Sequence, residues 1–547
     1  MIIKLKRGIR LIKIFVFLSI GCCILYKFQE ISLPKYYYDS VDPPAIKNFY
    51  HEPENSIDIL AFGSSHMLYG FYPMELYKNF GLKAYNLGSS VQPIEASYYL
   101  LKESLKSQSP QLVLLDVSSL FYIDTPNESF WRAILDNMPL SREKLEFTFT
   151  YIEHDNDFRF ADIIFPFIKF HERWNELTIA DFLNLQENYS YNKGGIVSSE
   201  SQSSNISEIR MNEIAEKLLN TTQREIREYR NSIYSHYFIE ASPYNMVPLE
   251  KNILWLTKIK KLCQENDVSL LLTKIPTVYN PTQYPSAWTK YRSEMIRQIC
   301  MQYDIDFFDP LYDSPINIDW STDSIDGGCH LNIFGAQKVT NCVGQYLACT
   351  YNIKSSSVDS WKTDLEIYQK VAKAASLEVE SDITEYLDIL KHNSSDLIIY
   401  ISTSGIDSNE PSHIYLTSFQ NLGLQFNLSD ISNNAYIAVI DKGVVIYEGL
   451  SNFSVQNRGI TSEIHQEYLL ESNSVYSNPS SSIYIGGSNF SMNQPGINIV
   501  VCDSISGYVI DSVCLSMDGD HKLYRDKWKF GYDFLRNYEM YLLNNIL

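Results

Sequence analysis

The sequence predicts an α/β protein with two folded domains: a three-layer domain built on a parallel sheet, and a smaller α/β (α+β) sandwich domain. Short apolar runs alternate with helix-like segments over 57–117 and again over 248–350, which is typical of buried parallel strands joined by helices. A polar linker, Ser355–Asp359, then leads into a unit of different texture. The chain of 547 residues is long enough to form both.

The first domain is expected over 55–353 and contains five short apolar strands. We predict these strands at Ile57–Phe62, Lys83–Leu87, Gln111–Val117, Ser269–Lys274 and Ile305–Phe308. Helices are predicted at 73–80, 94–107, 248–266, 287–303 and 333–350. Because strands that alternate with helices form crossover units, this order predicts helices on both faces of the sheet.

The alternation is interrupted between 122 and 247, and we interpret this aromatic- and charge-rich segment as an insertion. It contains a Ser/Gly-rich loop at 194–206 and a charged helix at about 207–230. Three of its side chains could cap a site, although a packed lid is the simpler interpretation: His154, His171 and Trp174.

The second domain is expected over 360–525 and combines helices with strands. Tyr436–Glu448 predicts a hairpin with its turn at Asp441–Gly443. A Tyr/Pro-rich spacer at 28–54 precedes the first domain, and an aromatic-rich tail at 526–547 follows the second. The other elements predicted in the second domain are helices at 362–377, 382–391 and 412–420 and strands at Leu397–Ser402, Ser482–Gly487, Ile497–Asp503 and Tyr508–Leu515.

The charge distribution separates the N-terminus from the rest of the chain. Residues 1–27 carry six basic residues and no acid, so the remaining 520 residues hold 39 basic and 65 acidic residues, a net charge of −26. Such an acidic body argues against nucleic acid as a partner. Ile14–Tyr26 is an uncharged apolar run behind five of the basic residues. It predicts a membrane anchor over 1–27, with a cytoplasmic N-terminus and an extracytoplasmic body; the alternative is a cleaved signal peptide.

Cysteine usage gives no reason to expect a metal or a cofactor. Of nine cysteines, two lie in the apolar N-terminal run and seven are scattered, with no Cys-x-x-Cys and no Cys/His cluster along the sequence. Zinc sites usually show such spacing, so buried free thiols are the simplest interpretation.

Three predicted strands end in residues that suit a nucleophilic site. Ser65 follows the first strand, Gly88 follows the second, and Asp116 ends the third; the carboxyl ends of parallel strands meet at one edge of a sheet. Asp326 and His330 come from the loop that enters the last helix. A serine nucleophile needs a base to take its proton, a carboxylate to orient that base, and backbone N–H groups to hold the oxyanion.

These segments resemble a known family. Gly63–Ser65, Asn86–Gly88 and Asp326–Asn332 are similar to blocks one, two and five of the SGNH (GDSL-like) hydrolases, and 56–120 and 248–352 match that family in element order. The chain resembles in particular the membrane-anchored members from bacterial envelope-polysaccharide loci, which are distantly related to the D-alanine transfer protein of lipoteichoic acid synthesis. The resemblance implies a flavodoxin-like sheet.

The same resemblance implies a role for each residue of the site. Ser65 would be the nucleophile, His330 the base and Asp326 the carboxylate that orients it. The backbone N–H groups of Ser65 and Gly88 would be the oxyanion donors.

Several departures from the family pattern leave alternatives open. Ser64 replaces the usual aspartate of block one, the Gly-x-Asn-Asp of block three is missing, and the spacing from Asp326 to His330 has one extra residue, so Asp323 remains a second candidate orienter. Loss of one oxyanion donor costs roughly 10²–10³ in rate, which suits a transferase or a weak hydrolase at least as well as a strong hydrolase. The rival hypothesis is a non-catalytic surface protein with a decayed site.

Three further residues near this edge are weaker candidates for substrate binding. His66 would line the cleft beside Ser65. Lys274, at the end of the fourth strand, would meet an anionic substrate or be a solvated loop lysine. Asp116 is favoured as a structural residue rather than a catalytic one.

The second domain resembles the interleukin-like epithelial–mesenchymal transition inducer (PANDER-like) family, through Ser395–Ser402, Tyr436–Glu448, Ile483–Asn489 and Gly496–Asp503. That resemblance implies a compact sandwich and a carbohydrate-binding role, with a structural or partner-binding module as the alternative. Together the two resemblances predict an envelope enzyme that acts on O-acyl groups, most plausibly acetyl, of a polysaccharide. The acidic body suits a neutral or cationic glycan better than an anionic one.

Overall fold

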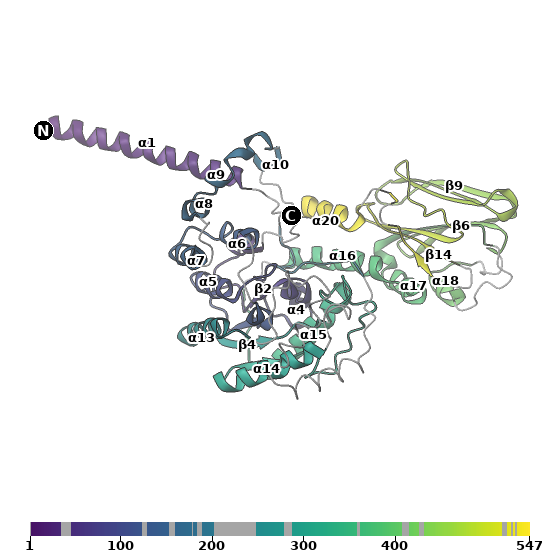
Figure 1. The fold of residues 1–547 in the computed structure, drawn as a ribbon. Helices are drawn as coiled ribbons and strands as arrows, with labels where there is room; N and C mark the ends of the chain where they lie inside the picture. Colours follow the sequence, from purple (N-terminus) through teal and green to yellow (C-terminus); the bar gives the residue numbers. More distant parts are fainter. Residues whose placement is uncertain are drawn as a thin grey trace, which may run out of the picture. The chain divides into compact units, whose positions relative to one another are not determined.

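The computed structural model describes residues 2–33, 45–122, 128–152, 159–177, 179–182, 189–201, 248–277, 287–357, 361–406, 415–425, 431–516, 522–526, 529–530 and 533–546. The chain divides into two compact units, and Figure 1 shows the elements of both. The first unit comprises 1–197 and 202–365; the second comprises 198–201 and 366–547.

A five-stranded parallel sheet forms the centre of the first unit. Neighbouring strands pair in parallel, with Ile59 opposite Ala84 on one side and Leu112 on the other. The strand order β2-β1-β3-β4-β5 is that of the flavodoxin-like doubly wound fold, so the predicted fold class is confirmed. The strands are β1 (Ile59–Phe62), β2 (Ala84–Asn86), β3 (Leu112–Asp116), β4 (Ser269–Thr273) and β5 (Asp306–Phe308).

Helices pack in pairs around this sheet and make the predicted three layers. α4 packs against α15, and α5 packs against α13. α4 begins at Pro73 and is capped after Phe80 by Gly81, whose φ of 69° is left-handed; both residues are typical of these helix ends. The helices are α3 (Ser65–Gly70), α4 (Pro73–Phe80), α5 (Ile94–Ser104), α13 (Glu250–Glu265), α14 (Ala287–Tyr303) and α15 (Ile333–Thr350).

The insertion between β3 and α13 forms short helices, and part of it returns to the sheet. The backbone N–H of Asn86, in edge strand β2, donates to the carbonyl of Lys193 at 2.8 Å. The predicted helix at 207–230 lies outside the described residues. The elements of the insertion are α6 (Glu128–Leu135), α7 (Arg142–Ile152), α8 (Phe160–Ile164), α9 (Pro166–Lys169), the 3₁₀ helix η2 (His171–Asn175) and α10 (Ile179–Phe182).

A buried ionic network holds this returning segment in place. Lys193 Nζ lies 2.7 Å from Glu52 Oε1 and 2.8 Å from Asp364 Oδ2, and all three side chains are almost fully buried. Trp361 Nε1 donates to the second oxygen of Glu52 at 3.1 Å. This network ties the insertion to Glu52, which precedes the first strand, and to Asp364, which follows the last helix of the parallel-sheet domain.

The N-terminal helix and the following residues differ from the prediction. α1 spans Ile2–Ser32, so it continues past residue 27 into the predicted spacer. Ile12–Gln29 is long and apolar enough to cross a membrane, a test that a signal sequence also passes. α2 (Ala45–Phe49) is largely buried, and Tyr85 Oη donates to the carbonyl of Ala45 at 2.8 Å. The end of the predicted spacer is therefore part of the first unit.

The second unit contains two antiparallel sheets, which confirms the predicted sandwich. One has six strands in the order β15-β14-β13-β6-β7-β8, and the other has four in the order β12-β11-β10-β9. The predicted hairpin is β7 and β8, joined at Lys442 and Gly443. The strands are β6 (Leu397–Ser404), β7 (Ala435–Asp441), β8 (Val444–Ser451), β9 (Ser454–Ile460), β10 (Glu467–Asn473), β11 (Ser480–Ile485), β12 (Ser488–Asn489), β13 (Gly496–Asp503), β14 (Val509–Leu515) and β15 (Leu523–Tyr524).

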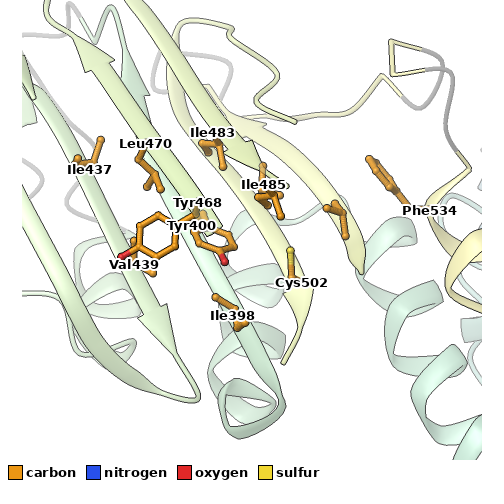
Figure 2. Packing of buried hydrophobic residues seen from close by; sticks show 12 residues of the cluster. Ile398, Tyr400, Ile437, Val439, Tyr468, Leu470, Ile483, Ile485, Cys502 and Phe534 are labelled. Atoms are coloured by element: carbon orange, nitrogen blue, oxygen red, sulfur yellow. The ribbon is translucent and has the colours of Figure 1, made fainter. Parts of the chain in front are cut away.

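The two sheets face each other across one apolar core (Figure 2). Tyr400 of the larger sheet and Tyr468 of the smaller sheet lie in it with ring centroids 5.4 Å apart. β10 and β11 alternate between buried and partly exposed residues, whereas β6, β7, β13 and β14 are buried throughout. This difference is expected where the smaller sheet has one wet face and the larger sheet has both faces covered.

Helices complete the second unit, and one of them corrects the prediction of a C-terminal tail. α20 packs on β14, its Phe534 belongs to the core in Figure 2, and its Tyr538 donates to Asp503 Oδ1 at 2.8 Å. Strands β9 and β10 were not predicted, because their polar, weakly alternating sequences lack the strand pattern. The helices are α16 (Lys362–Val379), which begins in the first unit, α17 (Ile383–His392), α18 (Leu416–Asn421) and α20 (Phe534–Ile546).

Candidate active site

The turn after β1 places Ser65 at the carboxyl edge of the parallel sheet. Ser64 caps α3 by accepting the His66 N–H at 3.3 Å, so Ser65 is the first residue of that helix. Gly63 permits the close packing of this turn, because a Cβ there would lie 2.7 Å from the Cβ of Asp116. Ser65 itself is partly exposed, which leaves its hydroxyl accessible to a substrate.

A compact loop before α15 carries the histidine. Gly327 and Gly328 have φ values of 77° and 113°, which only glycine adopts readily. They fold the chain back so that Asp326 Oδ1 accepts the backbone N–H groups of Cys329 and His330, at 3.0 and 2.9 Å. The extra residue between Asp326 and His330 is thereby accommodated in the loop.

Ser65, His330 and Asp326 form a continuous chain of hydrogen bonds. His330 Nε2 lies 2.8 Å from Ser65 Oγ, and His330 Nδ1 lies 2.7 Å from Asp326 Oδ2. Asp323, the other candidate orienter, is instead bound by Lys338 Nζ at 2.6 Å and by the backbone N–H of Asp319 at 2.8 Å. The geometry therefore favours Asp326 as the partner of His330.

The pair of Asp326 and His330 shifts the pKa of each group. Burial alone would lower the pKa of His330, but its hydrogen bonds to Asp326 and Cys329 outweigh burial and raise it to about 10. Burial alone would raise the pKa of Asp326, but the hydrogen bond and charge of His330 lower it. The carboxylate therefore stays ionised, and it makes the imidazole a stronger base.

The predicted oxyanion donors lie on neighbouring turns, and one of them already has an acceptor. A Cβ on Gly88 would come within 3.2 Å of the carbonyl oxygens of Gly63 and Ser64, so the two turns are in close contact. The Gly88 N–H donates to Asn86 Oδ1 at 3.0 Å. An oxyanion bound there would have to share or replace that contact.

The three weaker candidates are all buried, and two of them, His66 and Asp116, are hydrogen-bonded within the protein. His66 Nδ1 lies 2.9 Å from Ser118 Oγ, and burial together with the charge of His330 holds its pKa well below the usual range. Asp116 accepts the backbone N–H groups of Ser118 and Ile275, both at 3.2 Å. It thus joins the ends of β3 and β4.

Lys274 is buried, so the alternative prediction of a solvated loop lysine is wrong. Its side chain is 5% exposed, with Nζ 3.9 Å from Asp309 Oδ2. Burial lowers the pKa of its ammonium group, partly offset by Asp309. Nζ makes no hydrogen bond within the described part of the chain.

Two residues near the candidate site, Tyr69 and Cys329, are not among the site residues that the sequence predicts. The ring of Tyr69 lies 5.2 Å from that of His330, and Cys329 Sγ lies 3.8 Å from His66 Nε2. Tyr69 follows Ser65 by four residues on α3, so helical spacing was the signal that could have placed it on the same face. Cys329 had no signal beyond its adjacency to His330.

Of the three insertion residues predicted as a possible cap, the two that the structure describes lie next to α1. His171 and Trp174 are exposed on η2, which contacts α1. Arg173, between them, donates to the carbonyl of Ser32 at 2.8 Å. His154 lies outside the described residues.

Comparison with protein-family models finds no match, and comparison with curated proteins finds none. Among solved structures, a GDSL-like lipase from Bacteroides thetaiotaomicron is 9% identical, with a TM-score of 0.26, and the similarity covers 56% of this chain and 100% of that one. A catalytic mutant of an acetylxylan esterase from Geobacillus stearothermophilus is 10% identical, with a TM-score of 0.24, covering 55% and 99%. TM-scores this low give no ground for assigning the activity of these proteins to this chain.

The raised pKa of His330 predicts an alkaline activity profile. A base acts only when neutral, so labelling of Ser65 by a fluorophosphonate probe should slow as pH falls through that pKa, with a midpoint well above the ordinary histidine value of about 6.5. Asp326→Asn removes the group that raises the pKa, so the midpoint should move toward lower pH and the maximal rate should fall by roughly 10³–10⁴.

The measurement is the labelling rate against pH, with a chelator present throughout. Asp304→Asn is the matched control, because that aspartate is fully exposed and faces Lys260; it should leave the profile unchanged. An unmoved midpoint in Asp326→Asn would contradict the assignment of Asp326.

Proposed function

We propose that this chain is a serine esterase or O-acyltransferase that acts on O-acyl groups, chiefly acetyl, of a cell-envelope polysaccharide outside the cytoplasm. The observation that carries the proposal is the hydrogen-bonded chain from Asp326 Oδ2 through the His330 ring to Ser65 Oγ. Isolated Ser–His contacts are common, but an imidazole bonded on both nitrogens by a carboxylate and a serine is the arrangement that activates a nucleophile.

The proposed mechanism gives each group a separate role. Ser65 Oγ attacks the ester carbonyl while His330 Nε2 takes its proton, and Asp326 stabilises the imidazolium that forms. The backbone N–H of Ser65, with a contribution from Gly88, holds the oxyanion. His330 then returns the proton to the leaving hydroxyl of the sugar, which leaves an acyl group on Ser65.

The fate of the acyl group distinguishes an esterase from a transferase. Water or a second sugar hydroxyl would accept it, with His330 again acting as the base. The Gly88 N–H is engaged by Asn86, and no block-three asparagine is present to add a donor. Both features weaken the oxyanion hole and support transfer or slow hydrolysis over rapid hydrolysis.

Ser65→Ala tests the nucleophile directly. The substitution should abolish covalent labelling by the fluorophosphonate probe, and also acetate release from, or transfer to, acetylated envelope glycans, while the circular dichroism spectrum is unchanged. Ser321→Ala is the matched control, since that serine lies on the segment leading to His330 and bonds Asp319 instead. Labelling that survives in Ser65→Ala would favour the rival hypothesis of a non-catalytic surface protein.

The same proposal places α1 in a membrane as an uncleaved single-pass anchor. Its apolar side chains from Ile12 to Phe28 are mostly exposed in the structure. The elements that contact its C-terminal part, η2 and α10, also expose large apolar groups: Trp174, Ile179 and Phe182. Aromatic side chains at such a position suit the membrane–water interface, which supports a body held close to the bilayer.

Fractionation of cells expressing the full chain tests this topology. We expect the protein to resist alkaline carbonate extraction, to retain residues 1–27 on mass spectrometry, and to be degraded by protease added on the extracytoplasmic side of the membrane. A soluble chain that starts after residue 27 would identify a cleaved signal instead.

The second unit is proposed to hold the glycan that the first unit modifies. Its exposed aromatic side chains, Phe453, Tyr476 and Tyr524, have the apolar faces that stack on sugar rings, and the acidic body suits a neutral or cationic glycan. The alternative is a structural or partner-binding module.

Glycan affinity of the full chain separates these interpretations. Phe453→Ser and Tyr476→Ser together should weaken binding to deacetylated envelope glycan by about tenfold or more, as expected for the loss of 1.4 kcal/mol, without slowing the labelling of Ser65. Exposed Ile460→Ser is the control for loss of apolar surface. Equal glycan affinity of the wild type, the double variant and Ile460→Ser would contradict a glycan-binding role for these aromatic side chains.

A further inference from the structure

Three side chains that can ligate a metal ion meet at the candidate active site. They are His66, Cys329 and His330, and their ligand atoms all lie within 4.8 Å of one another. The sequence shows no Cys/His spacing of the usual kind, because His66 and Cys329 are 263 positions apart. The fold assembles the cluster by bringing the turn after β1 against the loop before α15.

The distance between His66 Nε2 and Cys329 Sγ suits a tetrahedral ion. Zinc binds imidazole nitrogen at about 2.0–2.1 Å and thiolate sulfur at about 2.3 Å, so a tetrahedral N–Zn–S angle places those two atoms about 3.6 Å apart. His66 Nε2 and Cys329 Sγ are 3.8 Å apart. Only small side-chain adjustments are needed to bring both onto one ion.

The outer ring nitrogens of both histidines are already held. His66 Nδ1 lies 2.9 Å from Ser118 Oγ, and His330 Nδ1 lies 2.7 Å from Asp326 Oδ2. Metal-binding histidines typically have such a partner on the nitrogen that does not bind the ion, because it fixes the tautomer and the ring orientation. Each histidine would therefore bind the ion through its Nε2.

The loop also fixes the cysteine. The backbone N–H of Cys329 donates to Asp326 Oδ1, so one carboxylate orients two of the three ligands. His66 is buried, whereas Cys329 and His330 are partly exposed, so an ion can enter from solvent. Two nitrogens and one sulfur favour zinc over the oxygen-seeking magnesium and calcium ions.

We propose that His66, Cys329 and His330 bind a Zn²⁺ ion that reversibly inactivates Ser65. The binding site stands on its own geometry, and the inhibitory effect rests on the proposed function. The Cys329 thiol loses its proton to solvent as the Zn–S bond forms, and no electron is transferred. The ion takes the lone pair of His330 Nε2, which is the lone pair that would accept the proton of Ser65. Ser65 is then left without a base, and a solvent molecule completes the four ligands.

Metal binding is tested on the full chain in detergent, after removal of metals with a chelator. Co²⁺, a spectroscopic substitute for Zn²⁺, should give a thiolate charge-transfer band in wild type and a weaker or absent band in Cys329→Ser. Cys349→Ser is the matched control, because Cys349 is an exposed free cysteine at the end of α15. We expect one Zn²⁺ per chain in wild type and Cys349→Ser, and affinity at least about 10–100-fold lower in Cys329→Ser.

Inhibition is tested by labelling Ser65 in the same three proteins, each compared with its own metal-free rate. Zn²⁺ should slow labelling in wild type and Cys349→Ser, with recovery after chelation, while Cys329→Ser resists the same zinc concentration. A Co²⁺ spectrum that Cys329→Ser leaves unchanged would overturn the metal site. A Cys329-dependent spectrum without slower labelling would overturn the inhibitory role. If Ser65 is never labelled, the proposed function fails, and the Co²⁺ spectrum still decides the metal site.

Discussion

The parallel pairing of β1 with β2 and β3 is the constraint on which the candidate site depends. It places the ends of three strands at one edge, so the turns that carry Ser65 and Gly88 contact each other and Asp116 packs against Gly63. The contact between Gly63 and Asp116 leaves no room for a side chain on the glycine. A rigid edge of this kind holds Ser65 in a fixed position while the rest of the candidate site comes from a distant loop.

That loop, residues 323–330, gives Asp326 three roles. The Asp326 carboxylate orients the His330 ring through Oδ2 and accepts the backbone N–H groups of Cys329 and His330 through Oδ1. Its hydrogen bond and negative charge also raise the pKa of the imidazole. Reactivity, loop geometry and the position of the cysteine are therefore coupled through one carboxylate. This coupling places Cys329, a ligand in the proposed zinc site, next to His330, the proposed base.

Much of the architecture followed from local pattern. The five short apolar runs, the glycine after α4 and the order of helices predict a three-layer domain with a parallel sheet, because buried parallel strands and helix ends have strong local signals. β9 and β10 were missed, since their polar sequences become strands only when paired across the smaller sheet. The sequence predicts a spacer and a tail where α2 and α20 form, because burial of Phe49 and Phe534 depends on surfaces formed by distant segments.

The sequence alone determined which residues are available: a serine after the first strand, an Asp-Gly-Gly-Cys-His loop before the last helix, and an apolar N-terminal helix. Only the tertiary structure shows that Asp326, and not Asp323, is hydrogen-bonded to His330. It also shows that Lys274 is buried, that the Gly88 N–H donates to Asn86, and that Cys329 lies beside His66. The physical reason is that hydrogen-bond partners and burial are properties of contacts between distant segments. Periodicity and spacing record only the neighbours along the chain.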